Sequence, residues 1–397
     1  MFSSCLFCFQ VNKSLFLPDD ILVKILCGLS AEDLLRCQLV CKKWNCLIST
    51  PQFNDMYLNG GAAVRRVIVR QYGKEEWGIN ILFIDDWYKK SRGIFKRKKK
   101  LRRTCTCEVL NCSLSDIFSY HGLLLVIYYG SQMRHVIFNP ITGVQLSFQI
   151  PHTTVIALYY HPVHKEYYGI GGRYLGTTDQ EFILLRIRSV LSNEVDFERG
   201  WRKLNYMLFP TPTCPAPIVK TDAIYWMAEQ MHPSGNDGCC GVYVIVFDIK
   251  KEEFHVISHP GERYCCQVLE QENVRMDLIE KEKVLSFCVM TFDAEEIVKL
   301  ELWDLEDEYR WSSSSETIIL DTKLYHLNGS FNLAVRVVGM LNGELIISWL
   351  RRGVLAYHLQ RRTLRVLDGL RGAHALIHNK TTFTFKGIPK IMNTPHI

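Results

Sequence analysis

Three helix signals within residues 17–53 constrain the fold of this chain more than any other feature. The first begins at Pro18, a residue favoured in the first helical turn, and Asp19 and Asp20 follow where negative charge complements the helix dipole. Apolar residues then recur along one wide helical face, at Ile21, Leu22, Ile25, Leu26 and Leu29. The spacing predicts an amphipathic helix that buries this face.

Two further helix signals follow closely. Ser30 precedes Asp33 at the spacing of a capping box, which predicts a second helix. From Leu39 the apolar residues lie on one side of a third helix, which we expect to stop at Pro51. A unit of about forty residues is too small to bury so much apolar surface by itself. The sequence therefore predicts a small three-helix module that needs a partner.

The same stretch resembles the F-box motif over its whole length. The matching residues are Leu17, Pro18, Ile25, Leu26, Asp33, Leu34, the run 40–44, Leu47, Ile48, Pro51 and Phe53. The resemblance implies docking on a Skp-type adaptor and, through it, on a cullin–RING ubiquitin ligase. We expect ten residues to divide between the adaptor interface and the core of the module: Leu17, Pro18, Ile21, Ile25, Leu26, Leu34, Val40, Trp44, Leu47 and Ile48. The alternative is a helical cap that only covers the following domain.

Composition indicates a folded chain with room for a second, larger domain. The 397 residues are 48% hydrophobic and 22% charged. No apolar run approaches the roughly 18–20 residues that span a bilayer. The apolar N-terminus has no basic residue before it and no small-residue cleavage site, so it is a poor signal peptide. We expect a location in the cytoplasm, the nucleus or both, with no membrane partner.

A single segment accounts for the net charge of the chain. Residues 95–103 contain seven basic side chains, so the formal charge of +6 falls to 6 − 7 = −1 without them. A protein that binds nucleic acid is usually basic over a broader surface, so we expect no nucleic-acid partner. The segment is interpreted as a solvated loop that is dispensable for folding, with a nuclear-localisation signal at 96–103 as the alternative.

After about residue 60, helical periodicity gives way to short β-type runs. A strand, a turn and a second strand recur, with Asn139, Asp248, Asp304 and His358 at equivalent places. The gaps between these residues are 109, 56 and 54, and half of 109 is close to the other two. A degenerate copy is therefore expected at residues 183–204. A second recurring element, a turn followed by an apolar strand, begins at His121, Thr221 and Asn342.

Each repeat holds about four strands in about fifty residues, too few to bury both faces of a sheet, so the copies must stack. Radial stacking protects the strand edges and suits four-stranded units. We predict a multidomain chain: an all-α F-box module over 15–60 and an all-β repeat domain over 61–397, a six-bladed β-propeller. The last strand, at 382–386, is expected to complete an irregular first blade. A two-sheet sandwich is the alternative.

The β region also resembles the F-box-associated domain of plant F-box proteins, which is akin to kelch-type repeats. The matching segments are residues 119–125, 138–143, 160–168, 223–226, 246–254 and 302–305, with Trp311. His121 stands where that family often has Asn. The double-glycine kelch signature is absent apart from Gly171 and Gly172. The resemblance implies a domain that recognises a target protein.

No motif for catalysis or for a cofactor is present, so we expect a non-catalytic protein with no cofactor and no metal. His161 and His164 could form a metal pair, but Pro162 indicates an ordinary turn. The 15 cysteines are an odd number without zinc-site spacing, and we interpret them as reduced, mostly buried thiols.

Two functions remain open. The first is the substrate-receptor subunit of a Skp–cullin–F-box ubiquitin ligase, which binds the adaptor through the F-box and a target protein through the β domain. The second is a propeller that binds a small molecule or a glycan, with the F-box serving a non-ligase complex. Specificity is expected in the longest irregular stretches, since loops carry binding residues on a rigid scaffold: residues 189–198, 209–217, 231–241 and 262–272.

Overall fold

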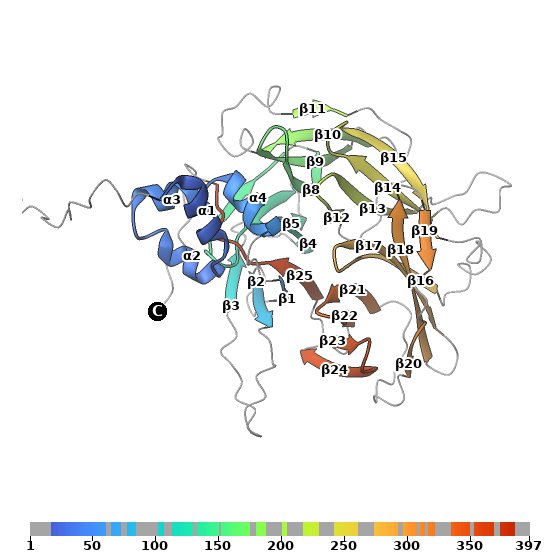
Figure 1. The fold of residues 1–397 in the computed structure, drawn as a ribbon. Coiled ribbons are helices and arrows are strands. Elements are labelled where there is room, and N and C mark those ends of the chain that lie inside the picture. The colour runs from blue at the N-terminus through green and yellow to red at the C-terminus, as the bar shows by residue number, and fades with distance from the viewer. Residues whose placement is uncertain are drawn as a thin grey trace, which may run out of the picture.

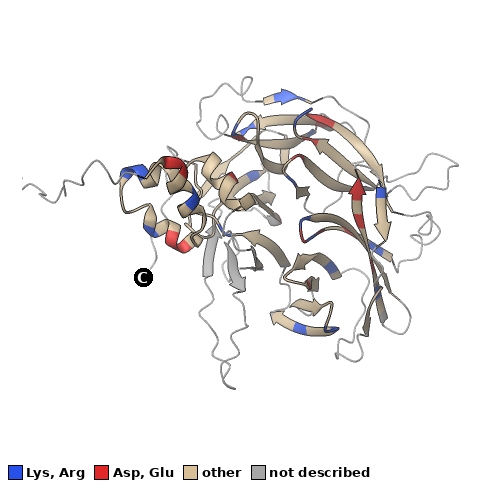
Figure 2. Ribbon diagram, viewed as in Figure 1, with Lys and Arg blue, Asp and Glu red and all other residues tan. Residues whose placement is uncertain are grey.

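The protein consists of a small helical module beside a ring of β-sheets (Figure 1). The computed structural model describes residues 17–60, 65–72, 78–84, 102–106, 113–129, 133–150, 152–174, 180–187, 201–204, 217–229, 242–260, 274–292, 297–307, 310–313, 317–321, 335–349, 353–368 and 374–385. Charges of both signs are interspersed along these helices and strands (Figure 2). Among the described helices, none has the length and apolar character to cross a membrane.

The helical module has four helices and not the expected three: α1 (Asp19–Cys27), α2 (Ala31–Cys37), α3 (Lys42–Ile48) and α4 (Pro51–Gly60). The Ser30 hydroxyl caps α2 by accepting a hydrogen bond from the Asp33 backbone N–H at 3.2 Å. The prediction failed at Pro51, which follows the end of α3 but also opens α4. Proline suits a first helical position, and the Thr50 hydroxyl caps this helix by accepting from the Phe53 N–H at 3.1 Å.

The described strands form six antiparallel sheets, five of four strands and one of five. Neighbouring strands of a sheet are mostly consecutive in the chain, so each sheet is a meander. With the strands of each sheet in their spatial order, the first two sheets are β25 (His374–Asn379), β1 (Arg65–Tyr72), β2 (Gly78–Ile84) and β3 (Arg102–Thr106), then β4 (Ser113–Tyr120), β5 (Leu123–Tyr129), β6 (Arg134–Phe138) and β7 (Gln145–Phe148). The next two sheets are β8 (Thr153–His161), β9 (Glu166–Tyr174), β10 (Gln180–Arg186) and β11 (Trp201–Lys203), then β12 (Ile218–Val219), β13 (Ala223–Glu229), β14 (Val242–Asp248) and β15 (Glu253–Ser258). The last two sheets are β16 (Val274–Lys281), β17 (Val284–Phe292), β18 (Ile297–Asp307) and β19 (Arg310–Ser313), with β20 (Ile318–Asp321) also paired with β18, then β21 (Val335–Leu341), β22 (Glu344–Trp349), β23 (Gly353–His358) and β24 (Thr363–Asp368).

Hydrophobic cores lie between successive sheets and join them into a propeller. One core combines β4–β7 with β8–β11, and the next combines β8–β11 with β12–β15. Two more join β12–β15 to β16–β20 and β16–β20 to β21–β24. The β21–β24 sheet packs in turn on β1 and β25. Each sheet therefore buries both faces against different neighbours, which a two-sheet sandwich would not allow.

The repeats seen in the sequence correspond to one place in each sheet. Asn139, Asp248, Asp304 and His358 lie in or directly after β6, β14, β18 and β23, the third strands of their sheets. The degenerate copy at 183–204 is β10 and β11, in the same position. The Asn139 and Asp248 side chains each accept hydrogen bonds from two backbone N–H groups of the turn that follows. These turns therefore follow directly from local chemistry.

The last strand of the chain completes the sheet that contains the first β-strand, as expected. This last strand is residues 374–379 and not the predicted residues 382–386. β25 (His374–Asn379) pairs with β1, with Val67 opposite Ile377. Residues 382–386, the predicted closing strand, lie after it. Thr382 and Phe383 are buried, and neither belongs to a strand. Pairing between segments about 300 residues apart cannot be read from local periodicity, which is why the wrong segment was chosen.

Several predictions fall partly or wholly outside the described residues. Of the basic segment, only Arg102 and Arg103 are described, and they pair with Leu82 and Ile81 as part of β3. The prediction of a solvated loop was therefore wrong for these two residues. The loops at 189–198, 231–241 and 262–272 lie outside the description, as does 209–217 apart from Pro217.

Candidate functional site

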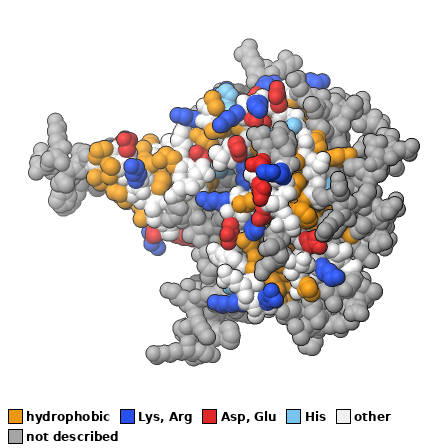
Figure 3. Space-filling model, turned by 45° about the vertical axis from the view of Figure 1, so that its right-hand side comes forward, with side chains coloured by type: hydrophobic (Ala, Val, Ile, Leu, Met, Phe, Trp, Pro, Cys, Tyr) orange, Lys and Arg blue, Asp and Glu red, His pale blue; other side chains and the backbone are white. Residues whose placement is uncertain are grey.

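An unpartnered apolar surface lies on the helical module. Ile21 and Ile25 lie one turn apart on α1 and are 42% and 51% exposed, and Leu17 just before them is 50% exposed. Leu39 and Val40, between α2 and α3, are 86% and 63% exposed. We call these five residues the apolar stripe. Hydrophobic side chains cover much of the module in Figure 3. Large apolar side chains gathered in this way commonly mark a protein interface.

The remaining predicted residues form the core of the module. Leu26, Leu34 and Ile48 are at most 1% exposed and pack together with Leu22, Phe53 and Tyr57. Burial removes these side chains from direct contact with any partner. Along one helix, Ile25 faces solvent and its neighbour Leu26 faces the core.

Three predicted residues have intermediate or supporting places. Pro18 is exposed, and its backbone carbonyl accepts the first N–H groups of α1, from Ile21 and Leu22. Trp44 and Leu47 are only partly buried at the edge of the module core. Trp44, one of the ten residues expected in the interface or the core, packs against the core and keeps part of its surface exposed.

An ion pair links α1, which carries one part of the apolar stripe, to α3, which follows the other part. Lys43 Nζ lies 2.5 Å from Asp19 Oδ1, so the start of α3 sits beside the start of α1. Both side chains are about half exposed, so the pair itself contributes little stability. The pair links the first turn of α3 to the first turn of α1.

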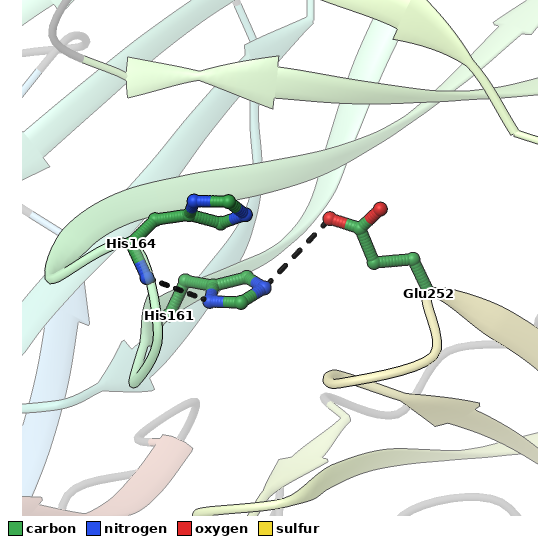
Figure 4. A group of neighbouring side chains, drawn as sticks. All are labelled: His161, His164 and Glu252. Atoms are coloured by element: carbon green, nitrogen blue, oxygen red, sulfur yellow. Dashed lines mark hydrogen bonds and ion pairs between the residues drawn. The ribbon is translucent and has the colours of Figure 1, made fainter.

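His161, His164 and Glu252 form the group that most resembles a metal site among the described residues (Figure 4). His161 Nδ1 accepts hydrogen bonds from the backbone N–H groups of Val163 and His164, at 3.2 and 3.3 Å. A neutral imidazole that accepts at Nδ1 carries its proton on Nε2, the atom 3.7 Å from Glu252 Oε1. Burial lowers the pKa of His161, which favours this neutral form. Glu252 is also paired with Arg202. A metal ion on Nε2 would have to displace this proton, and Glu252 would have to give up Arg202.

A cavity of about 1200 Å³ occupies the centre of the ring. Its lining comes from the innermost strands and from Asp55 and Leu58 of α4, so the helical module borders one mouth. Two of its cationic lining groups have acidic neighbours: Lys220 Nζ lies 2.9 Å from Glu280, and Arg336 lies 3.7 Å from the buried Asp277. Burial raises the pKa of Asp277, against the effect of the neighbouring Arg336 and Arg275.

Comparison with known proteins identifies both domains. Residues 15–54 match the F-box-like family, and residues 87–385 match the F-box associated beta propeller domain. The second match covers more than half of the chain. The protein belongs to the F-box-associated β-propeller family. Its F-box is the helical module, and the apolar stripe is therefore a surface of the F-box.

The family includes plant relatives of low identity. The chain is 24% identical over 330 residues to the Arabidopsis thaliana F-box protein At1g33020, covering 78% of this chain but only 54% of that relative. It is 23% identical over 359 residues to the Arabidopsis thaliana F-box protein At5g65850, covering 85% of this chain and 80% of the relative. Among solved structures, TolB from Acinetobacter baumannii is 8% identical with a TM-score of 0.39, covering 83% of this chain and 68% of TolB. We draw no argument from that last likeness.

Two features of this F-box protein were missed from the sequence. Leu39 is the most exposed of the large hydrophobic residues in the described part of the chain, and it was assigned to a helix face. Asn54 is a polar residue with a fully buried side chain, and nothing in its sequence neighbourhood distinguishes it from an ordinary surface asparagine. The burial of Asn54 depends on residues that are distant in the chain.

Proposed function

We propose that this protein is the substrate-receptor subunit of a Skp–cullin–F-box ubiquitin ligase. The observation that carries the proposal is the apolar stripe on a module whose own core is already complete. Burial of apolar surface is worth about 25 cal/mol per Å², so these side chains favour association with an apolar partner. A Skp-type adaptor is the partner that the F-box family implies, and the cullin–RING ligase would follow through it.

The propeller has the role of target capture in this proposal. In this proposal, each of the six described sheets acts as one blade of a propeller domain over residues 61–397, and the F-box spans residues 15–60. The receptor needs no nucleophile of its own and is not an enzyme. Holding a target lysine near the charged conjugating enzyme makes the transfer effectively intramolecular. Localisation to the cytoplasm, or to the nucleus through residues 96–103, suits such a receptor.

The alternative function, binding of a small molecule or glycan, would use the central cavity. Cavities of this kind bind small molecules when a few polar groups converge on an apolar lining. In this cavity Lys220 and Arg336 have acidic neighbours within the protein, so these two cations are less available to a ligand, which favours the receptor function over the alternative. The two functions differ in whether the F-box engages a ligase adaptor.

The test is binding of the full chain to a purified Skp-type adaptor, with Ile25→Asp as the variant. Ile25 is half exposed on the apolar stripe, so a buried carboxylate there should weaken binding at least about tenfold, or 1.4 kcal/mol. Val163→Asp is the matched control, because Val163 is 66% exposed in a turn of the propeller. Calorimetric titration measures both. Equal affinities for Ile25→Asp and the unmodified chain would contradict the proposed docking surface.

A further inference from the structure

A buried asparagine joins the F-box to the propeller. Asn54 of α4 is 1% exposed and lies against three separate segments of the β domain. Its side-chain amide donates to Tyr167 Oη at 2.7 Å and to the His121 carbonyl at 3.2 Å. Its Oδ1 accepts a hydrogen bond from the Thr381 hydroxyl. A buried amide with all these partners orients α4 far more narrowly than apolar contact would.

The third of these segments, residues 380–385, follows the closing strand β25, and we call it the C-terminal strap. The Asn139 amide donates to the Thr381 and Phe383 carbonyls, at 3.0 and 2.8 Å, which fixes the strap on the β4–β7 sheet. The Phe383 ring stacks on Tyr167 with 5.0 Å between centroids. Lys380 reaches Glu32 of α2 at 2.9 Å. The strap therefore contacts both the F-box and two propeller sheets.

The turn beneath the strap is shaped for this close contact. Gly122 has a φ of +79°, and a Cβ there would overlap the Thr381 side chain. The preceding residue, His121, donates or accepts at Tyr167 Oη through Nδ1 at 2.8 Å and lies 3.3 Å from Asp55 through Nε2. Burial raises the pKa of Tyr167 well above its usual value, so its hydroxyl remains a neutral donor and acceptor. The polar groups of α4 and of the propeller at this contact therefore have hydrogen-bond partners in one another.

Apolar contact supplements the polar network. Ala31, the first residue of α2, is buried in one cluster with Ile117, Leu124 and Val126 of the β4–β7 sheet. α2 and α4 are therefore both held against the same sheet, at two points separated along the module. Two anchors of different chemistry resist rotation as well as separation.

We propose that Asn54 and the C-terminal strap form a rigid joint that fixes the orientation of the F-box relative to the propeller. Asn54 is then a positioning residue for ubiquitin transfer. The inference rests on the proposed receptor function. The orientation of the F-box relative to the propeller matters for ubiquitin transfer when the F-box is bound to the adaptor and the propeller holds the target protein with its lysine. A narrow orientation limits which lysines come within reach of the conjugating enzyme.

The first test measures orientation in the full chain bound to a Skp-type adaptor. Spin labels replace Arg36 on α2 and Lys251 on the propeller, whose side chains are 80% and 71% exposed. We expect one narrow distance peak for the unmodified chain. Asn54→Leu, of similar size, should lose that single peak, because it leaves the Tyr167 and Thr381 hydroxyls without this partner. A chain ending at Asn379 keeps β25 but lacks the strap, and should lose the peak as well.

Gln52→Leu is the matched control, since Gln52 is an exposed residue of the same helix and should retain the peak. Thermal unfolding of each variant separates a loosened joint from an unfolded propeller. If Asn54→Leu fails to fold, the strap truncation carries the test alone. A single narrow peak in a folded Asn54→Leu chain, or in the folded truncation, would overturn the joint.

The second test uses the chain's own propeller lysines as ubiquitin acceptors in a reconstituted ligase. Mass spectrometry maps the modified lysines. The unmodified chain should be modified at a restricted set and folded Asn54→Leu at a wider one, while adaptor affinity is equal. The same set in both chains would overturn the positioning role. Absence of adaptor binding in the unmodified chain would instead reject the proposed function, so the two failures are distinguishable.

Discussion

At the scale of single residues, buried imidazoles connect the sheets of the propeller. His135 of β6 has no exposed surface, and its Nε2 accepts a hydrogen bond from the Val155 backbone N–H of β8 at 3.0 Å. Burial lowers the pKa of His135 to about 4. The neutral imidazole therefore bridges two sheets, and protonation would break this bridge and place a charge in the core.

The lowered pKa of His135 predicts a pH-dependent stability. In the unfolded chain a histidine titrates near 6.5, so the folded protein binds fewer protons below that pH. The contribution of neutral His135 to the unfolding free energy is complete above pH 6.5 and is lost as the pH falls towards about 4. As the pH falls between these values, the unfolding free energy of the unmodified chain should decrease faster than that of His135→Gln. The difference between the two slopes should be up to about 1.4 kcal/mol per pH unit. Urea unfolding at pH 7 and pH 5 measures the difference. Parallel pH dependence of the two proteins would contradict the assignment.

At the scale of elements, the boundary of β3 decides how much of the basic segment is dispensable. Arg102 and Arg103 pair with β2, whereas the other five basic residues of the segment precede the strand. Cations crowded together in sequence repel one another and are not buried without partners. Two of the seven basic residues in segment 95–103 therefore belong to β3, and the other five come before it in the sequence.

Deletion of residues 95–101 should leave the melting temperature nearly unchanged, because β3 stays intact. Deletion of 95–103 should lower it, because the first two pairs of β3 with β2 are lost and the edge of the sheet is shortened. Differential scanning calorimetry of both deletions in parallel measures this. The shorter deletion also tests the nuclear role of the segment, as reduced nuclear entry of a stable protein. Equal melting temperatures for the two deletions would show that β3 begins later than Arg102.

At the scale of the whole molecule, closure of the ring depends on its last strand. β25 supplies the innermost strand of the sheet that contains β1, and Ala375, Leu376 and Ile377 pack into the cores on either side. The first and last parts of the β domain are thereby held in one sheet. Without β25, the edge of β1 would be unpaired, and unpaired edges promote association.

A chain that ends at residue 373 should therefore melt at a lower temperature and aggregate. A chain that ends at Phe385 retains β25 and the C-terminal strap and serves as the control, with the melting temperature of the full chain. Light scattering during a thermal ramp measures both aggregation and its onset. Unchanged melting of the shorter chain would mean that the ring is held by the inter-sheet cores alone.

The sequence by itself determined the features that depend on neighbouring residues. Helix starts at Pro18 and Ser30, turns at Asn139 and Asp248, and the repeat of strand pairs were all predicted. At Ser30, Asn139 and Asp248 the side chain accepts a hydrogen bond from a backbone N–H within three residues, so the structure there depends on the local sequence. Helical periodicity together with the F-box resemblance led to the expectation that ten residues divide between an adaptor interface and the core. They could not tell which residue would take which place.

Tertiary structure alone decided that Ile25 is exposed while Leu26 is buried, that β25 closes the ring, and that Asn54 is sealed between two domains. Ile25 and Leu26 belong to one wide apolar face, and only the packing of α4 on α1 selects the buried half. Asn54 meets Tyr167 and Thr381, which are 113 and 327 residues away. Residues so far apart in the sequence meet only when the propeller has formed, and the sequence around Asn54 does not indicate which distant residues it will contact.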